Sequence, residues 1–210
     1  MICAIVLAAG RSRRMGAQKL LLPVGGQPAI ACIVDQVLAG PVDRAFVIIG
    51  RDGERVAQAL AGRPVAFVDN GDPEGEMLTS VRCGLAAMPD DTAAVLVVLG
   101  DQPGITADIV ATLVRAFRAN RRGIVVPTHG GRRGHPLLFA AHYRHEILSR
   151  YQGIGLRGLL QAHPEDVFEV DVAAPGVLED MDVPEDYGRM GGSLPPGGKP
   201  PPAGCTPAGG

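Results

Sequence analysis

Tryptophan is absent from this 210-residue chain and only 4% of its residues are aromatic, so an aliphatic core is expected. No apolar run approaches the roughly 18–20 residues that a membrane-spanning helix needs. An excess of charge of one sign is also lacking, and a net charge of −2 gives no overall basic field for nucleic acid. The N-terminus begins with an apolar run and shows no secretory signal, so we expect a cytoplasmic protein.

Cysteine is scarce as well. Its four residues are Cys3, Cys32, Cys83 and Cys205, and none forms a C-x-x-C pair, which argues against a zinc site. Cys3 lies in an expected strand, and Cys32 and Cys83 lie in apolar segments of helical pattern. We expect these three to be buried, reduced thiols rather than disulfides or catalytic nucleophiles.

Short apolar runs alternate with segments of helical periodicity in the first 126 residues. The expected strands are 2–7, 45–49, 65–68, 93–99 and 124–126, and the expected helices lie near 28–39, 53–62, 76–88 and 106–119. This alternation predicts an α/β fold of three layers, with a mostly parallel sheet covered by helices on both faces. Ligands of such sheets bind at the carboxyl ends of the strands.

The pattern changes after residue 127, where a glycine-rich, basic segment begins. Two more strands and two more helices are expected at 136–139, 167–172, 142–149 and 155–162. We interpret this region as an elaboration of the same domain that covers the substrate. From residue 188 on, the chain is mostly Gly, Pro and small residues, which bury too little apolar surface to offset their ordering entropy. The sequence thus predicts a single domain over 1–187 and a disordered tail over 188–210.

A loop suited to a polyphosphate follows the first expected strand. Residues 7–23 contain two glycines, three arginines and a lysine. Glycine lets the backbone approach an anion closely, and the cations neutralise its charge. The spacing matches neither the P-loop nor the Rossmann pattern. A surface loop with solvated arginines is the alternative, but a strand end, two glycines and four cations together favour a phosphate site.

The same stretch resembles the signature of nucleotidyltransferases that share the fold of the molybdenum-cofactor guanylyl- and cytidylyltransferases. That signature is Leu-Ala-(Ala/Gly)-Gly-x-Ser-x-Arg-Met-Gly-x-x-Lys-x-Leu, and it matches at Leu7, Ala8, Gly10, Ser12, Arg14, Met15, Gly16, Lys19 and Leu21. The resemblance implies a nucleotide-diphospho-sugar transferase-like, Rossmann-related fold. The nucleotide-binding residues it implies in this loop are Leu7, Ala8, Ala9, Gly10, Arg11, Ser12, Arg14 and Lys19. Arg14 and Lys19 would act catalytically on phosphate oxygens.

Two acidic positions bear on a metal site. Asp101 follows the strand at 93–99, where a carboxylate suits Mg²⁺ together with phosphate oxygens, although spacing alone also fits an Asp that caps a turn. Residues 100–103, Gly-Asp-Gln-Pro, resemble the family's Gly-Asp-x-Pro, and residues 180–186 resemble its Asp-Ile-Asp-Thr-Pro-Glu-Asp. The resemblance implies Mg²⁺ held by Asp101, which would be catalytic, and by Asp182. Without it, the second segment reads as a solvated turn and a helix start.

Two further segments resemble substrate contacts of the family. Residues 76–85 resemble Gly-Met-x-x-Ser-(Leu/Val)-Arg-x-Gly-Leu, which places the base or ribose near Ser80, although Glu76 replaces the usual glycine. Residues 133–136, Arg-Gly-His-Pro, resemble the motif of relatives that transfer CMP to molybdopterin, so Arg133 and His135 are the implied acceptor contacts. The alternatives are an ordinary hydroxyl hydrogen bond in a helix turn and a histidine that serves only the turn before proline.

The resemblance spans residues 2–187 and implies an enzyme that moves CMP from CTP to the phosphate of a molybdopterin-type cofactor, releasing pyrophosphate. Positioning and charge neutralisation suffice for such a transfer. CTP is expected over GTP, because guanylyl-transferring relatives carry glycine where this chain has Ala9. Two alternatives stay open, an NTP transferase for another small phosphorylated acceptor and a non-catalytic molybdenum-cofactor chaperone. A molybdenum hydroxylase-type apoenzyme is a candidate partner; nucleic acid and membrane are not expected.

Overall fold

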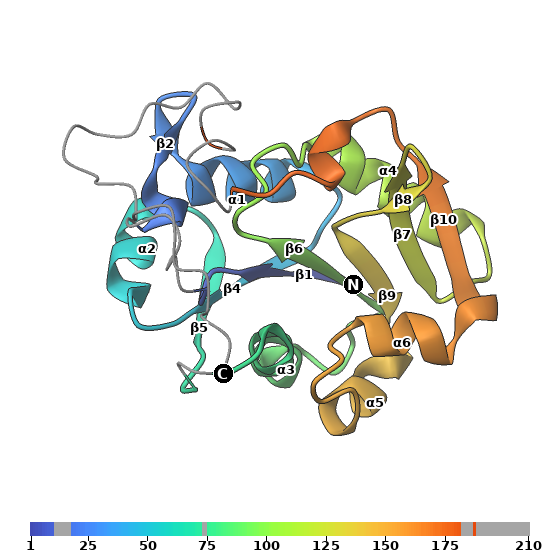
Figure 1. Cartoon of the computed structure of the whole chain (residues 1–210). Helices are drawn as coiled ribbons and strands as arrows, with labels where there is room; N and C mark the ends of the chain where they lie inside the picture. The colour runs from blue at the N-terminus through green and yellow to red at the C-terminus, as the bar shows by residue number, and fades with distance from the viewer. Residues whose placement is uncertain (11–17, 73–74, 182–186, 188–210) are drawn as a thin grey trace, which may run out of the picture.

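A mixed β-sheet runs through the middle of the structure, with helices on both of its faces (Figure 1). The computed structural model describes residues 1–10, 18–72, 75–181 and 187. The strands are β1 (Ile2–Leu7), β4 (Arg44–Ile49), β5 (Val65–Asp69), β6 (Ala94–Leu99), β7 (Ile124–His129), β8 (Arg132–Arg133), β9 (Leu137–Ala140) and β10 (Val167–Asp171). Their order is β10-β7-β9-β6-β1-β4-β5, with β8 paired to β7.

The predicted three-layer, mostly parallel fold is confirmed. One face of the sheet carries α1 (Ala29–Ala39), α2 (Gly53–Ala59) and α4 (Ala107–Ala119), and the other carries α3 (Met77–Ala87), α5 (Arg144–Ser149) and α6 (Arg157–Ala162) (Figure 1). Each of these six helices and each of β1, β4, β5, β6, β7, β9 and β10 overlaps an expected segment. Thr106 caps the N-terminus of α4, because its side chain accepts a hydrogen bond from Ile109 N at 3.3 Å.

Strand β1 shows why its sequence is apolar at every position. Ile2, Ala4 and Val6 pack into the core beneath α1 and α4, whereas Cys3 and Ile5 pack into the core beneath α3. Successive side chains of a strand point to opposite faces, and helices cover both faces here, so no position can be polar.

The region after residue 127, expected to elaborate the same domain, contributes strands to the sheet itself. β9 lies between β6 and β7 and runs antiparallel to both. β7 turns into β8 through Gly130 and Gly131, whose φ angles of +57° and +74° suit glycine. A second hairpin, β2 (Pro23–Val24) and β3 (Gln27–Pro28), was not predicted, although its Gly-Gly turn was a signal for it.

The cysteine prediction is partly right. Cys3, Cys32 and Cys83 are all reduced, but only Cys3 is fully buried. Cys83 is half-buried, and burial raises the pKa of its thiol, which keeps it protonated and unreactive at neutral pH. Cys205 and the predicted tail at 188–210 lie outside the described residues.

The strand order reverses between β1 and β6, and this reversal positions the site. The chain passes from β1 to β4 and β5 on one side, then crosses back to β6 on the other side of β1. In open α/β sheets a ligand binds at such a switch point, at the carboxyl ends of the strands. Gly10 and Asp101 follow the two strands there. Along the ranges that the structure describes, no helix is long and apolar enough to cross a membrane.

Candidate active site

The carboxyl ends of β1 and β6 open onto a cavity of about 230 Å³, here called the switch-point cavity. Its lining consists of Leu7, Ala9, Gly10, Lys19, Leu20, Asn70, Asp72, Gly75, Met77, Ser80, Leu99, Gly100 and Asp101. Six predicted site residues thus meet in one place, namely Leu7, Ala9, Gly10, Lys19, Ser80 and Asp101. Ala8 is not among them, because it is buried and its backbone N donates to Ile48 O at 2.9 Å. Arg11, Ser12 and Arg14 lie outside the described residues.

Lys19 and Asp101 form an ion pair inside this cavity. Lys19 begins a short 3-10 helix, η1 (Lys19–Leu21), and its Nζ lies 2.6 Å from Asp101 Oδ2. The two side chains are only 12% and 21% exposed. The pair brings together the segments after β1 and after β6. It also places a fixed cation and a fixed carboxylate side by side, which suits a ligand that brings phosphate oxygens to the one and a metal ion to the other.

The donor chemistry around Asp101 fits a hard cation such as Mg²⁺. Met181 N donates to Asp101 O at 2.9 Å, so the chain reaches Asp101 one residue before Asp182, which itself lies outside the described residues. Gln102 is 3% exposed, and its Oε1 accepts no hydrogen bond within the described part of the chain. No group of three or more His, Cys, Asp and Glu gathers among those residues. Mg²⁺ does not require one, because one or two carboxylates and substrate phosphates can hold it.

Asn70, which was not predicted as a site residue, holds the Ser80 side chain in place through a hydrogen bond. Ser80 lies in the first turn of α3, is buried, and accepts a hydrogen bond from Asn70 Nδ2 at 2.9 Å. Asn70 Oδ1 in turn accepts from Asp72 N at 3.2 Å, which fixes the amide. Asn70 directly follows β5, so a polar residue at the end of a buried strand was the signal for it.

A second cavity, of about 500 Å³, opens between β8–β9 and α6, and is here called the α6 cavity. Both predicted acceptor contacts, Arg133 and His135, line it. Arg133 Nε donates to Glu169 Oε1 at 2.7 Å near the surface, so part of its charge is already balanced. Burial lowers the pKa of His135, and the charge of Asp101 opposes that shift only partly. His135 is therefore neutral at pH 7 and offers hydrogen bonds rather than a positive charge.

The two cavities are neighbours that share a lining residue. The Asp101 carboxylate, which lines the first, acts electrostatically on His135, which lines the second, and Met77 lines both. Three residues that were not predicted as site residues also line the α6 cavity. Arg157 adds a positive charge, and Met77 and Ile154 add exposed apolar surface. Exposed hydrophobic side chains of this kind carry no distinct sequence pattern, so only their place in the fold identifies them.

Comparison with known proteins identifies the same architecture. The family model described as the MobA-like NTP transferase domain matches residues 4–167. The bifunctional protein GlmU of Mycolicibacterium paratuberculosis is 38% identical over 133 residues, which are 59% of this chain and 27% of that protein. The chain thus spans about a quarter of the length of that relative. Nicotine blue oxidoreductase of Paenarthrobacter nicotinovorans is 28% identical, covering 90% and 96% of the two chains. Molybdenum cofactor cytidylyltransferase of Escherichia coli is 26% identical, covering 89% and 93%.

Solved structures agree with the fold. A nucleotidyl transferase from Methanothermobacter thermautotroptrophicus superposes with a TM-score of 0.79 at 27% identity, over 90% of this chain and 95% of that one. Rv0371c from Mycobacterium tuberculosis gives a TM-score of 0.76 at 26% identity, over 90% and 96%. The resemblance inferred from the N-terminal loop therefore extends over most of the chain.

Proposed function

The chain belongs to the MobA-like NTP transferase family, and on that premise we propose that it transfers CMP from CTP to the phosphate of a molybdopterin-type cofactor, releasing pyrophosphate. The observation that carries this proposal is the pair of adjoining cavities. One holds Gly10, Lys19 and Asp101 at the switch point, and the other holds Arg133 and His135. Two substrates bound in these cavities would meet at their shared border, which is what a direct transfer between them requires.

The proposed reaction is a single displacement at phosphorus. An oxygen of the acceptor phosphate attacks the α-phosphorus of CTP, and the bond from that phosphorus to the bridging oxygen breaks, so pyrophosphate leaves with the electron pair. The attacking phosphate is already ionised at neutral pH, so no general base is needed. Lys19 neutralises charge on the phosphates, and Arg14 is proposed to do the same. Mg²⁺, held by Asp101 and Asp182, would supply further neutralisation of the triphosphate and pyrophosphate charge.

Ala9 supports CTP as the donor. Ala9 lines the switch-point cavity and lies beside Gly50, where a Cβ built on Gly50 would be 3.2 Å from Ala9 Cβ. The loop therefore has little room to retreat toward β4, and a bulky purine would have to displace it. One methyl discriminates by only about 1–3 kcal/mol, so we propose that contacts near Ser80 contribute the rest.

Three other functions must be distinguished from the proposed one by experiment. An NTP transferase for a different small phosphorylated acceptor would release pyrophosphate with that acceptor only. A molybdenum-cofactor chaperone, which hands the cofactor to a molybdenum hydroxylase-type apoenzyme, would bind molybdopterin without using an NTP. The match to nicotine blue oxidoreductase over nearly the whole chain favours an oxidoreductase as a third possibility, in which an electron transfer would replace nucleotidyl transfer.

The deciding experiment incubates the protein with each NTP in turn, Mg²⁺ and molybdopterin, and measures pyrophosphate release and the mass of the product. The expected result is pyrophosphate release with CTP and a product heavier than the acceptor by one CMP unit. Binding of molybdopterin without pyrophosphate release would favour the chaperone. Oxidation of NADH or NADPH in place of nucleotidyl transfer would favour the oxidoreductase.

A further inference from the structure

Exposed apolar side chains gather at the α6 cavity. The described part of the chain exposes three large hydrophobic side chains, Phe67 at 41%, Met77 at 53% and Ile154 at 56%. Two of them, Met77 and Ile154, line this one cavity, and they come from segments far apart in the sequence. Met77 is at the start of α3, and Ile154 belongs to the loop between α5 and α6; these three helices lie on the same side of the sheet (Figure 1). Exposed apolar groups on two walls of one cavity indicate a ligand with an apolar part.

A hydrogen bond joins the two segments next to these side chains. Gly153 N donates to Glu76 Oε2 at 3.0 Å, so the residue before Ile154 is tied to the residue before Met77. Arg82 on α3 adds a second tether, because its Nη2 donates to Arg150 O at 2.7 Å and its Nε to Ile147 O at 3.0 Å. The separation of the two apolar walls is therefore fixed at two points, by Glu76 just before α3 and by Arg82 on α3.

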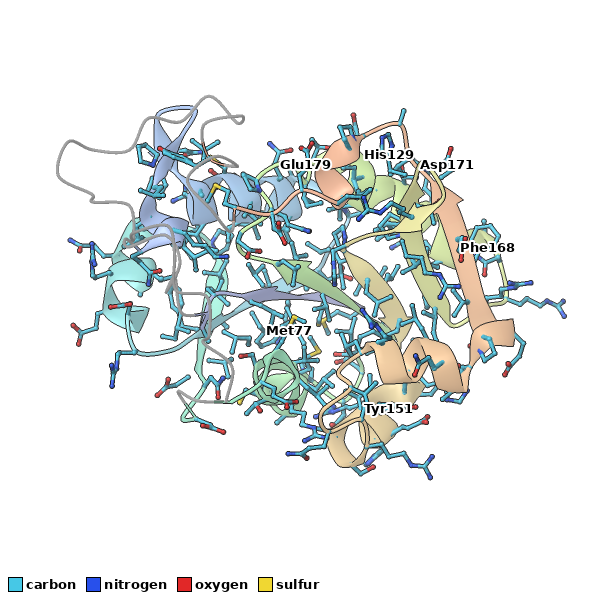
Figure 2. All side chains as sticks on the ribbon, viewed as in Figure 1. Met77, His129, Tyr151, Phe168, Asp171 and Glu179 are labelled. Carbon is cyan, nitrogen blue, oxygen red and sulfur yellow. The ribbon has the colours of Figure 1, made fainter. Side chains whose placement is uncertain are left out.

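Contacts within the α5–α6 region also make the loop that carries Ile154 rigid. Tyr151, labelled in Figure 2, has a φ of +73°, an unfavourable angle for a residue with a side chain. Its hydroxyl donates to Glu146, and its ring lies against Gly158, where an added Cβ would come within 2.3 Å of the ring. These contacts hold the unusual backbone in place, so the wall is preformed rather than shaped by its ligand.

The charges around the cavity identify the rest of the ligand. Arg133 and Arg157 both line it, and His135 is neutral. Arg157 makes no ion pair or hydrogen bond through its side chain within the described ranges. An anionic group is therefore the complement of the rim, while a polyhydroxylated sugar would leave hydroxyl groups against Val97, Val126 and Leu137.

We propose that Met77 and Ile154 are specificity-determining residues that contact the apolar part of an anionic acceptor, and that Glu76 sets their separation as a positioning residue. This inference rests on the proposed function, since it specifies the acceptor class of the same site. It favours an anion with a sizeable apolar part over a small sugar or polyol phosphate. It also gives a physical reason for the glutamate at position 76, where the resembling proteins usually have glycine.

Binding of pterin-6-carboxylate, followed by its fluorescence, tests the proposal without turnover. The wild-type protein is expected to bind this ring anion about 10-fold or more tightly than glycerol 3-phosphate, measured by competition. Ile154→Ala should weaken pterin binding about 10-fold, as expected for the loss of apolar contact in a binding pocket. Phe67→Ala is the matched control, because Phe67 is similarly exposed but lies on β5, away from the cavity, and it should change nothing.

Glu76 is tested by a pair of variants. Glu76→Gln keeps an oxygen that can accept from Gly153 N and should bind the pterin like wild type, whereas Glu76→Ala should lose several-fold in affinity. If Glu76 had a purely structural role, substitution would lower the melting temperature, and the two variants would not differ in their affinity for the pterin. The proposal is overturned if wild type does not bind the pterin saturably, if Ile154→Ala binds it as wild type does, or if glycerol 3-phosphate binds equally well.

The outcome is separable from that of the proposed function. Pterin binding with the expected variant pattern, but no pyrophosphate release from any NTP, would remove the transferase proposal and leave the acceptor contacts standing. Pyrophosphate release with CTP and molybdopterin, with an acceptor KM unchanged in Ile154→Ala, would do the reverse.

Discussion

Gly84→Ala is expected to destabilise the protein, although alanine is the better helix former. Gly84 lies in α3 on the buried side that faces the sheet. A Cβ placed there would lie 2.7 Å from Ile5 Cδ1, 2.9 Å from Ile5 Cγ1 and 3.1 Å from Ile48 Cδ1. Carbon atoms in good contact are about 3.5–4.0 Å apart. The new methyl must therefore push α3 away from β1 and β4, or force Ile5 out of its preferred rotamer.

The magnitude follows from two opposing terms. Overpacking a close-packed core costs about 1–3 kcal/mol, and replacing glycine by alanine inside a helix recovers up to about 1 kcal/mol. The net loss in the free energy of unfolding then lies between about 0 and 3 kcal/mol, and the 2.7 Å approach to Ile5 Cδ1 places it near the middle of that range, at about 1–2 kcal/mol. For a domain of this size each kcal/mol shifts Tm by about 2–4 °C, so Tm should fall by roughly 2–8 °C. Thermal melting followed by circular dichroism measures this, and urea unfolding gives the free energy directly.

Two further variants isolate the clash. Ala86→Gly, on the exposed side of the same helix, reports helix propensity alone and should cost up to about 1 kcal/mol. Ile5→Val removes the Cδ1 atom nearest to the new methyl, so the double variant should be more stable than the sum of the two single changes predicts. A Gly84→Ala protein that melts above wild type would refute the reasoning, because helix propensity would then outweigh any steric cost.

The remaining predictions concern the site and the loop beside it. Asp101→Asn should lower kcat by about 100-fold or more while Tm changes little, since the amide oxygen can still accept from Lys19 Nζ; turnover near wild type at saturating Mg²⁺ would contradict the metal assignment. Lys19→Ala should raise the activation barrier by about 2–4 kcal/mol, seen in kcat/KM for the NTP. Ala9→Gly should narrow the ratio of kcat/KM between CTP and GTP, and an unchanged ratio would remove Ala9 from the selectivity argument. Burial and Glu146 raise the pKa of Tyr151 from 10.0 to about 12. The neutral hydroxyl therefore stabilises the fold fully below pH 10.0, and this stabilisation is lost as the pH rises through about 12. In Tyr151→Phe the free energy of unfolding should depend less on pH between 10.0 and about 12, measured by urea unfolding at several pH values.

The strands and helices were predictable because the pattern of apolar residues in the sequence follows which positions are buried. β1 and β6 are apolar at successive positions, and only a strand with both faces covered has that pattern. The direction of a buried strand has no such signature. The sequence of β9, Leu-Leu-Phe-Ala, is as apolar as those of its neighbours β6 and β7, yet β9 runs antiparallel to both. Its hydrogen-bond partners decide its direction, and these depend on where the rest of the chain arrives.

The site was predictable to the extent that it lies at strand ends. Gly10 and Asp101 follow buried strands, and the fold brings them to one cavity as expected. Asn70 follows β5 by the same rule and was overlooked because no motif marked it. The loop around Tyr151 was beyond prediction, since a left-handed tyrosine is sterically unfavourable and becomes possible only through contacts with Glu146 and Gly158, which the folded chain supplies.

Helix α3 connects the packing of the core to both cavities. Its inner side holds Gly84 against β1 and β4, and its first turn contributes Met77 and Ser80 to the lining of the cavities. Close packing transmits displacements with little loss, so a helix raised at Gly84 also moves its first turn. Gly84→Ala should therefore raise the KM values of the NTP and of the acceptor together, at temperatures well below its Tm. A change in stability with both KM values unaltered would mean that the core absorbs the strain locally and that α3 does not couple the two cavities.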